Sequence, residues 1–221
     1  MGAITRAAAN NFTTSGVILP GAINNTTVAS ISQLTQVAGK TQTLIQSQTA
    51  SSSSAINFTT GIDNSYDIYK FEFINLHPAT DNVQFFHGAS TDGGSNYNLA
   101  PILTFFEAEN GEGSEGATLN YITSHDNDTN SDNSAKMTYN IGNDSDQSIS
   151  GEMWLFGPSD TTFTKAFMTS ISCTHRSNYI KNSYTCGYYN TTSDIDAMQF
   201  SLSSGNIDAG KIKLYGNWCG I

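Results

Sequence analysis

Hydrophobic and polar residues alternate with a period of two along most of the chain from residue 41 onward. In the clearest run, residues 66–76, one face carries Tyr69, Phe71, Phe73 and Asn75 and the other carries Ile68, Lys70, Glu72 and Ile74. This pattern predicts a β-strand whose aromatic face points inward. Similar short runs occupy residues 41–48, 55–58, 83–86, 98–106, 118–123, 135–141, 148–156, 163–173, 184–189, 197–202 and 211–215.

Turn-forming residues separate these runs. Residues 90–96 have Asp92-Gly93 at their centre, as in a tight hairpin. Gly157-Pro158 ends the run at residues 148–156. About eleven short strands with turns every 8–12 residues or so are typical of a sandwich or jelly roll. We therefore predict that residues 41–221 form an all-β, antiparallel, jelly-roll-like β-sandwich.

Residues 1–40 differ from the rest, because they are small and polar with scattered apolar residues and no clear period. Alone, such a segment cannot bury enough apolar surface to stay ordered. We expect an extended N-terminal arm that a partner chain holds or that docks on its own domain. The apolar candidates for anchoring it are Ile4, Phe12, Val17, Ile18 and Leu19.

Composition narrows the classes of partner. Nine basic and nineteen acidic residues give a net charge of −10. This charge argues against binding nucleic acid and against an anionic membrane surface. No apolar run is long enough to span a bilayer, and the first residues lack the apolar core of a signal peptide. We expect a protein made in a cytoplasm.

One loop resembles half of a calcium site. Asp126, Asp128 and Asp132 lie within a run of oxygen-bearing residues, as in the first half of an EF-hand loop. However, Ser131 stands where that loop needs glycine, and Met137 stands where it needs a bidentate glutamate. A solvated polar loop is the alternative interpretation.

Enzymatic motifs are weak. The carboxylates Glu107, Glu109, Glu112 and Glu115 lie among glycines, so we interpret them as a solvated surface loop rather than an acid–base pair. The chain has neither a Gly-x-Ser-x-Gly elbow nor a phosphate-binding glycine loop. We predict no enzymatic activity and no cofactor.

Aromatic and cysteine residues leave two alternatives open. Most aromatics fit inner faces, but a tyrosine near a loop could stack on a sugar ring. The candidates are Tyr66, Tyr97, Tyr188 and Tyr189. Cys173, Cys186 and Cys219 are expected to be reduced thiols, with a Cys173–Cys186 bridge across a hairpin as the alternative.

Three stretches carry a resemblance to a known family. They are residues 1–6 (MGAITR) with 22–30 (AINNTTVAS); residues 48–50 (QTA), 56–63 (INFTTGID) and 71–80 (FEFINLHPAT); and residues 187–197 (GYYNTTSDIDA), Phe200, 203–210 (SSGNIDAG) and 213–216 (KLYG). They resemble virion proteins of marine bacteriophages, over nearly the whole chain. That family offers no catalytic motif to transfer, and its members are mostly structural.

The resemblance implies a tail-fibre or particle-surface protein, located in the virion and touching other capsid or tail proteins. Because such parts are usually symmetric oligomers, we expect a homotrimer. The alternative is a receptor-binding module of the tail that recognises a glycan of the host surface. A depolymerase is the third hypothesis, disfavoured because phage depolymerases are usually long β-helices.

Overall fold

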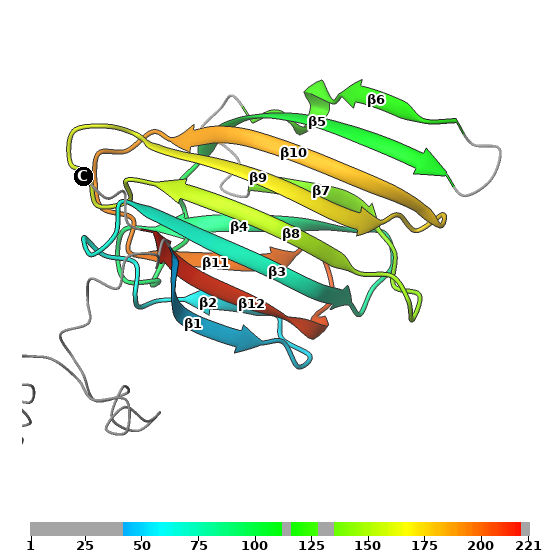
Figure 1. Ribbon diagram of the computed structural model, residues 1–221, viewed down its shortest axis with the longest axis horizontal. Coiled ribbons are helices and arrows are strands. Elements are labelled where there is room, and N and C mark those ends of the chain that lie inside the picture. Colours follow the sequence, from blue (N-terminus) through cyan, green and yellow to red (C-terminus); the bar gives the residue numbers. More distant parts are fainter. Residues whose placement is uncertain (1–41, 112–115, 128–134, 218–221) are drawn as a thin grey trace, which may run out of the picture. The chain divides into compact units, whose positions relative to one another are not determined.

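The computed structural model describes residues 42–111, 116–127 and 135–217. Within these ranges twelve β-strands and one short 3₁₀ helix (Thr123–His125) are formed (Figure 1). The strands are β1 (Gln42–Thr49), β2 (Ala55–Phe58), β3 (Ile68–Pro78), β4 (Val83–Ser90), β5 (Pro101–Gly111), β6 (Thr118–Tyr121), β7 (Ala135–Ile141), β8 (Ile149–Phe156), β9 (Lys165–Thr174), β10 (Tyr179–Tyr189), β11 (Ala197–Leu202) and β12 (Ile207–Asn217).

The strands form two antiparallel sheets. The large sheet has eight strands in the order β1-β12-β3-β8-β9-β10-β5-β6, and the small sheet has four in the order β2-β11-β4-β7. Figure 1 shows the strands of the small sheet behind those of the large one. The predicted all-β sandwich is therefore confirmed.

The connections are those of a jelly roll. Strands β1 to β4 alternate between the large and the small sheet, and so do β7-β8 and β11-β12. These eight strands place β1-β12-β3-β8 against β2-β11-β4-β7, the double Greek key of jelly-roll domains. The remaining strands, β5, β6, β9 and β10, lengthen the large sheet at one edge. We call these four the extension strands.

Aromatic side chains fill the space between the sheets. Phe200 on β11 lies 4.9 Å from Phe71 and 5.1 Å from Phe73, both on β3, between ring centroids. Phe85 on β4 lies 5.2 Å from Phe73, and Phe58 on β2 lies 5.3 Å from Phe71. These edge-to-face pairs each contribute about 0.5–1.5 kcal/mol beyond their buried area. They fix the face of β3 that points inward.

One expectation for β3 is wrong. Tyr69, Phe71 and Phe73 point inward as predicted, but Asn75 is exposed and Leu76 is buried instead. The pairing of β3 with β8 shifts between Phe73 and Leu76. Asn75 has a φ of 47°, and its N–H donates to the Ser150 hydroxyl over 3.0 Å. This β-bulge reverses the alternation for the rest of the strand.

Other boundaries differ in a systematic way. The predicted strands at 55–58, 135–141 and 197–202 are confirmed, whereas β4, β10 and β12 extend beyond their predicted ranges. The turn at residues 90–96 forms, with Asp92 accepting hydrogen bonds from the backbone N–H and the side chain of Asn96. It is not a hairpin, because β4 and β5 belong to different sheets.

Candidate functional site on the large sheet

The extension strands carry most of the exposed hydrophobic surface. Nine large hydrophobic side chains are exposed among the described residues, and all but Leu44 and Phe163 lie on these strands. They are Phe106 on β5, Leu119 and Tyr121 on β6, Met168 on β9, and Ile180, Tyr184 and Tyr188 on β10. Such concentration on one face is characteristic of an interaction site.

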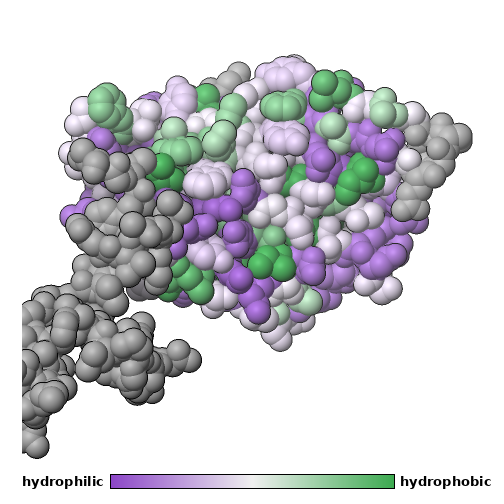
Figure 2. Space-filling model, viewed as in Figure 1, coloured by the Kyte–Doolittle hydropathy of each residue, from purple (hydrophilic) through white to green (hydrophobic). Residues whose placement is uncertain are grey.

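All seven side chains point to the outer face, away from the small sheet. Along β10 the even-numbered residues are exposed and the odd-numbered ones are buried or half-buried, and β5 and β9 alternate in the same way. Cross-strand pairing places Tyr184 opposite Phe106, and Phe106 opposite Tyr121. In Figure 2 hydrophobic residues are scattered among near-neutral ones in the upper part of the view, where Figure 1 places the extension strands.

No charged residue lies among the described outward-facing residues of the extension strands. These residues are Ile102, Thr104, Phe106, Ala108 and Asn110 on β5; Leu119 and Tyr121 on β6; Ala166, Met168, Ser170, Ser172 and Thr174 on β9; and Ile180, Asn182, Tyr184, Cys186 and Tyr188 on β10. We call this set the uncharged face. It stands out in a protein with a net charge of −10.

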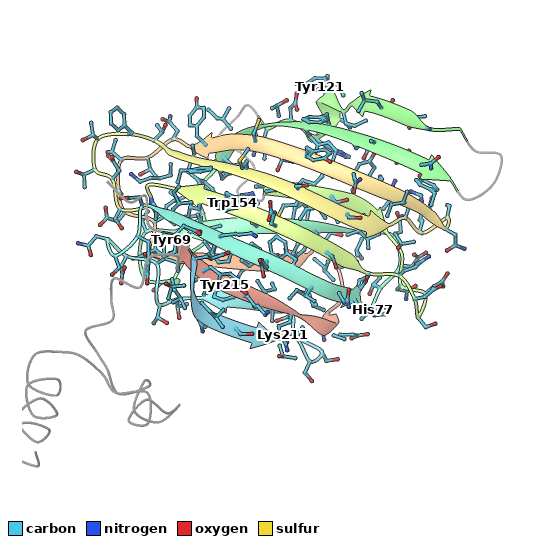
Figure 3. The ribbon with its side chains drawn as sticks, in the orientation of Figure 1. Tyr69, His77, Tyr121, Trp154, Lys211 and Tyr215 are labelled. Carbon is cyan, nitrogen blue, oxygen red and sulfur yellow. The ribbon has the colours of Figure 1, made fainter. Side chains whose placement is uncertain are left out.

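Aromatic rings on this face are held in place. Tyr184 and Phe106 stack with centroids 5.1 Å apart and planes 16° apart. The Tyr121 hydroxyl accepts a hydrogen bond from the Thr104 hydroxyl over 3.2 Å and donates to the Asp126 carboxylate. Figure 3 shows Tyr121 at the β6 end of the large sheet. Side chains fixed on strands form a more rigid surface than loop residues would.

A shallow groove of about 380 Å³ overlaps one edge of the uncharged face, with which it shares Ser170, Ser172 and Asn182. It crosses β3, β8, β9 and β10, and its polar lining consists of Glu72, Ser150, Glu152, Ser170, Ser172 and Asn182. The side chains of Ser170, Ser172 and Asn182 make no hydrogen bond to the described part of the chain. The β3 bulge borders the groove, and Gly151 on β8 lines the groove. A Cβ atom added to Gly151 would come within 2.2 Å of the Ser170 carbonyl oxygen.

Charges beside the groove are paired. The Lys70 ammonium lies 3.1 Å from a Glu72 oxygen and 2.8 Å from a Glu152 oxygen, and it sits 5.2 Å from the centre of the Trp154 ring. The Trp154 indole N–H donates to Glu152 over 3.1 Å. Burial opposes the charge of Lys70, but hydrogen bonds to the two carboxylates raise its pKa. In Figure 3 Trp154 lies over the middle strands of the sheet.

No family model, curated protein or solved structure matches the chain. Among the described residues, no helix is long and apolar enough to cross a membrane.

The structure separates the predicted tyrosine candidates. Tyr188 lies on the uncharged face and is 37% exposed, whereas Tyr189 is fully buried, with its hydroxyl 2.6 Å from His87 Nδ1. The proposed sugar contact at Tyr189 is wrong, because successive residues of a strand point to opposite faces. Tyr97 is partly buried against the 90–96 turn, and Tyr66 packs edge-to-face on Tyr69.

The candidate calcium loop is only partly described. Asp128 and Asp132 lie outside the described residues. Asp126 accepts a hydrogen bond from the Phe105 backbone N–H over 2.9 Å and another from Tyr121, so its carboxylate ties the loop to β5 and β6. Met137, at the twelfth position, is fully buried in the core. The predicted anchoring residues Ile4, Phe12, Val17, Ile18 and Leu19 also lie outside the described residues.

The interpretation of the carboxylate run as a surface loop is wrong for Glu107 and Glu109. Both belong to β5, and Glu107 is 1% exposed on its inner face. The fully buried Lys181 ammonium lies 3.2 Å from Glu107 and 3.1 Å from Glu109. The Tyr139 hydroxyl donates a hydrogen bond to Glu107 over 2.5 Å. The Lys181 ammonium lies 3.4 Å from the centre of the Tyr139 ring. Glu112 and Glu115 lie outside the described residues.

This ion cluster holds the extension against the small sheet. Lys181 comes from β10 and its carboxylate partners from β5, whereas Tyr139 comes from β7. Burial and, as the second cause, the hydrogen bond to Glu107 raise the pKa of the Tyr139 hydroxyl well above its ordinary value. The phenol therefore stays protonated and continues to donate. Sequence reasoning missed the cluster, because a charge inside a strand looks like a surface residue until its partner is known.

The cysteines do not form the alternative bridge. Cys173 and Cys186 are both free, and in the β9–β10 hairpin Cys173 lies opposite Lys181 while Cys186 lies opposite Met168. Cys173 is buried and Cys186 is exposed. Burial raises the pKa of the Cys173 thiol to about 11. Cys219 lies outside the described residues.

Proposed function

We propose that the protein is a non-enzymatic structural component of a bacteriophage particle, a surface fibre or decoration that residues 1–40 anchor to the capsid or tail. In this proposal it is made in the host cytoplasm and assembles as a homotrimer. The jelly-roll order of eight strands carries the argument, because viral capsid proteins often use this fold. The resemblance of three stretches to marine phage virion proteins supports it independently.

The jelly-roll fold supports this function by analogy, because proteins with one fold have many different functions. The experiment therefore tests location. Antibodies against the jelly-roll domain should label purified phage particles in immunogold electron microscopy. In a phage encoding Val17, Ile18 and Leu19 replaced by serine in the full chain, labelling should be lost while the protein still accumulates in the host. Undiminished labelling of the variant particles would refute the anchoring role, and unlabelled wild-type particles would refute the proposal.

The matched control is Phe163→Ala, which removes an exposed aromatic side chain of the loop before β9. Particles carrying it should be labelled like the wild type. Light scattering on the full chain after size-exclusion chromatography tests the trimer. A monomeric mass would contradict that part of the proposal.

A second candidate function is recognition of a host-surface glycan. The specific observation is the uncharged face, where exposed aromatic rings alternate with hydroxyl and amide side chains. Jelly-roll folds also include lectin domains. This function is compatible with a place in the particle, because anchoring is assigned to residues 1–40 and glycan contact to other residues of the chain.

A further inference from the structure

The outer face of the large sheet combines two kinds of surface in one row. From β3 to β6 the row runs through Glu72, Glu152, Ser170, Tyr184, Phe106 and Tyr121. Each residue is the direct cross-strand partner of the next. With strands about 4.8 Å apart, the row extends over roughly 24 Å. Its first half lines the polar groove, and its second half consists of aromatic rings.

Such a row matches the chemistry of a sugar chain. A pyranose has apolar C–H faces, which stack on aromatic rings, and an edge of hydroxyl groups, which exchange hydrogen bonds with carboxylates, amides and hydroxyls. Tyr184 and Phe106 offer the rings, while Ser170, Ser172 and Asn182 offer side-chain hydrogen-bonding groups without partners in the described chain.

The charges select among glycans. The uncharged face contributes none, and the groove is lined by the carboxylates of Glu72 and Glu152, which share the Lys70 ammonium. An anionic sugar would lose water without gaining a cation to bind, and the net charge of −10 would repel it further. A neutral chain avoids this cost.

We propose that the uncharged face and the overlapping groove bind a neutral oligosaccharide, with Tyr184 and Phe106 as the stacking platform. This inference rests on the second candidate function and names its site and ligand class. The groove supplies hydrogen bonds through Asn182 and Ser172. The length of the row suits several sugar units rather than a monosaccharide.

The test is a printed array of neutral, uronate-bearing and sulfated oligosaccharides, probed with the full-length protein. Hits should be confined to neutral glycans, and the best hit should then be titrated by calorimetry. Tyr184→Ala and Asn182→Ala should each weaken that binding at least about tenfold, because each removes a side chain that contacts the sugar in this proposal. Asn182 is the second variant, since it is exposed, lines the groove and lies outside the Tyr184–Phe106 stack.

Phe163→Ala is the control, because its aromatic ring is 69% exposed but lies outside the uncharged face. It should bind like the wild type, and all variants should keep the wild-type circular dichroism spectrum. No hit among neutral glycans, hits confined to anionic ones, or unweakened binding by both variants would overturn the inference. An oligomer that dissociates in Tyr184→Ala without any glycan hit would also overturn it and assign the face to self-association.

These outcomes separate the inference from the particle assignment. A phage carrying Tyr184→Ala should keep the immunogold label, because the anchoring residues are untouched, while losing adsorption to its host. Loss of the label by the anchor variant combined with an empty array would retain the structural role and remove the glycan site.

Discussion

Replacing Lys181 with methionine removes the ammonium group that contacts both Glu107 and Glu109, while keeping an apolar stem of similar length. Glu107 then remains 1% exposed, and its carboxylate keeps only the hydrogen bond that the Tyr139 hydroxyl donates. Breaking a buried ion pair from one side costs about 3–5 kcal/mol, because the other charge is left uncompensated. For a domain of this size each kcal/mol lowers the melting temperature by about 2–4 °C. We expect a decrease of about 6–20 °C.

Equilibrium unfolding in urea, followed by tryptophan fluorescence, measures the free energy directly. The midpoint should fall while the denaturant dependence stays constant. Lys211→Met on β12 is the control, since this lysine is exposed, and it should change stability by no more than about 0.5 kcal/mol. The double variant Lys181→Met/Glu107→Leu should recover part of the loss, because both buried charges are then gone.

A destabilisation by Lys181→Met of less than about 1 kcal/mol would refute the reasoning. It would mean that water or a rearranged side chain stabilises the Glu107 carboxylate at little cost in free energy. A double variant no more stable than the single one would show that packing, rather than the uncompensated charge, causes the loss.

Three further predictions concern single residues. Burial lowers the pKa of His87 to about 3, whereas an unfolded histidine titrates near 6.5, so the unfolded state binds more protons. His87 should therefore contribute a loss of stability of about 1.4 kcal/mol per pH unit as the pH falls from about 6.5 to 4, and an unchanged slope in His87→Gln contradicts this cause. Maleimide labelling of native protein, mapped by mass spectrometry, should modify Cys186 and spare Cys173; equal labelling contradicts the burial of Cys173. Gly151→Ala should destabilise the domain by about 1–3 kcal/mol, whereas Gly116→Ala, whose Cβ meets nothing within 4 Å, should not; equal urea midpoints would refute the clash.

Sequence periodicity predicted the sandwich well where each strand has one apolar face. The runs at β2, β7 and β11 gave correct boundaries because their buried residues, apart from Thr138, are hydrophobic. The aromatic face of β3 was correct up to Phe73. Beyond it the bulge at Asn75 inverted the pattern, and a bulge depends on the partner strand rather than on local sequence.

The ion cluster explains the larger errors. The predicted strand for β10 began at residue 184, after Lys181, and the predicted strand for β5 stopped at residue 106, before Glu107. Both predictions failed at an inward-facing charge. Lys181 pairs directly with Glu109 across the two strands, so each charge compensates the other. Reading either strand alone could not reveal this, since burial of a charge depends on a partner from elsewhere in the chain.

The candidate site was predicted only at Tyr188. The uncharged face lies on alternate residues of four strands, and their adjacency follows from the insertion of two strand pairs into the jelly roll. The local signal was the run of uncharged residues at even positions of 180–188 and 166–174. Its meaning required knowing that the two runs, together with β5, share one side of one sheet.

The position of β12 between β1 and β3 has a consequence for biosynthesis. A ribosome makes β1 and β3 long before β12, and both pair with β12 along nearly their full length. During that interval two strand edges have no partner in their final sheet, a state that favours aggregation. β8, β9 and β10, by contrast, can pair as each emerges. The nascent chain therefore needs either protection of its first strands or a delay in their ordering until β12 arrives.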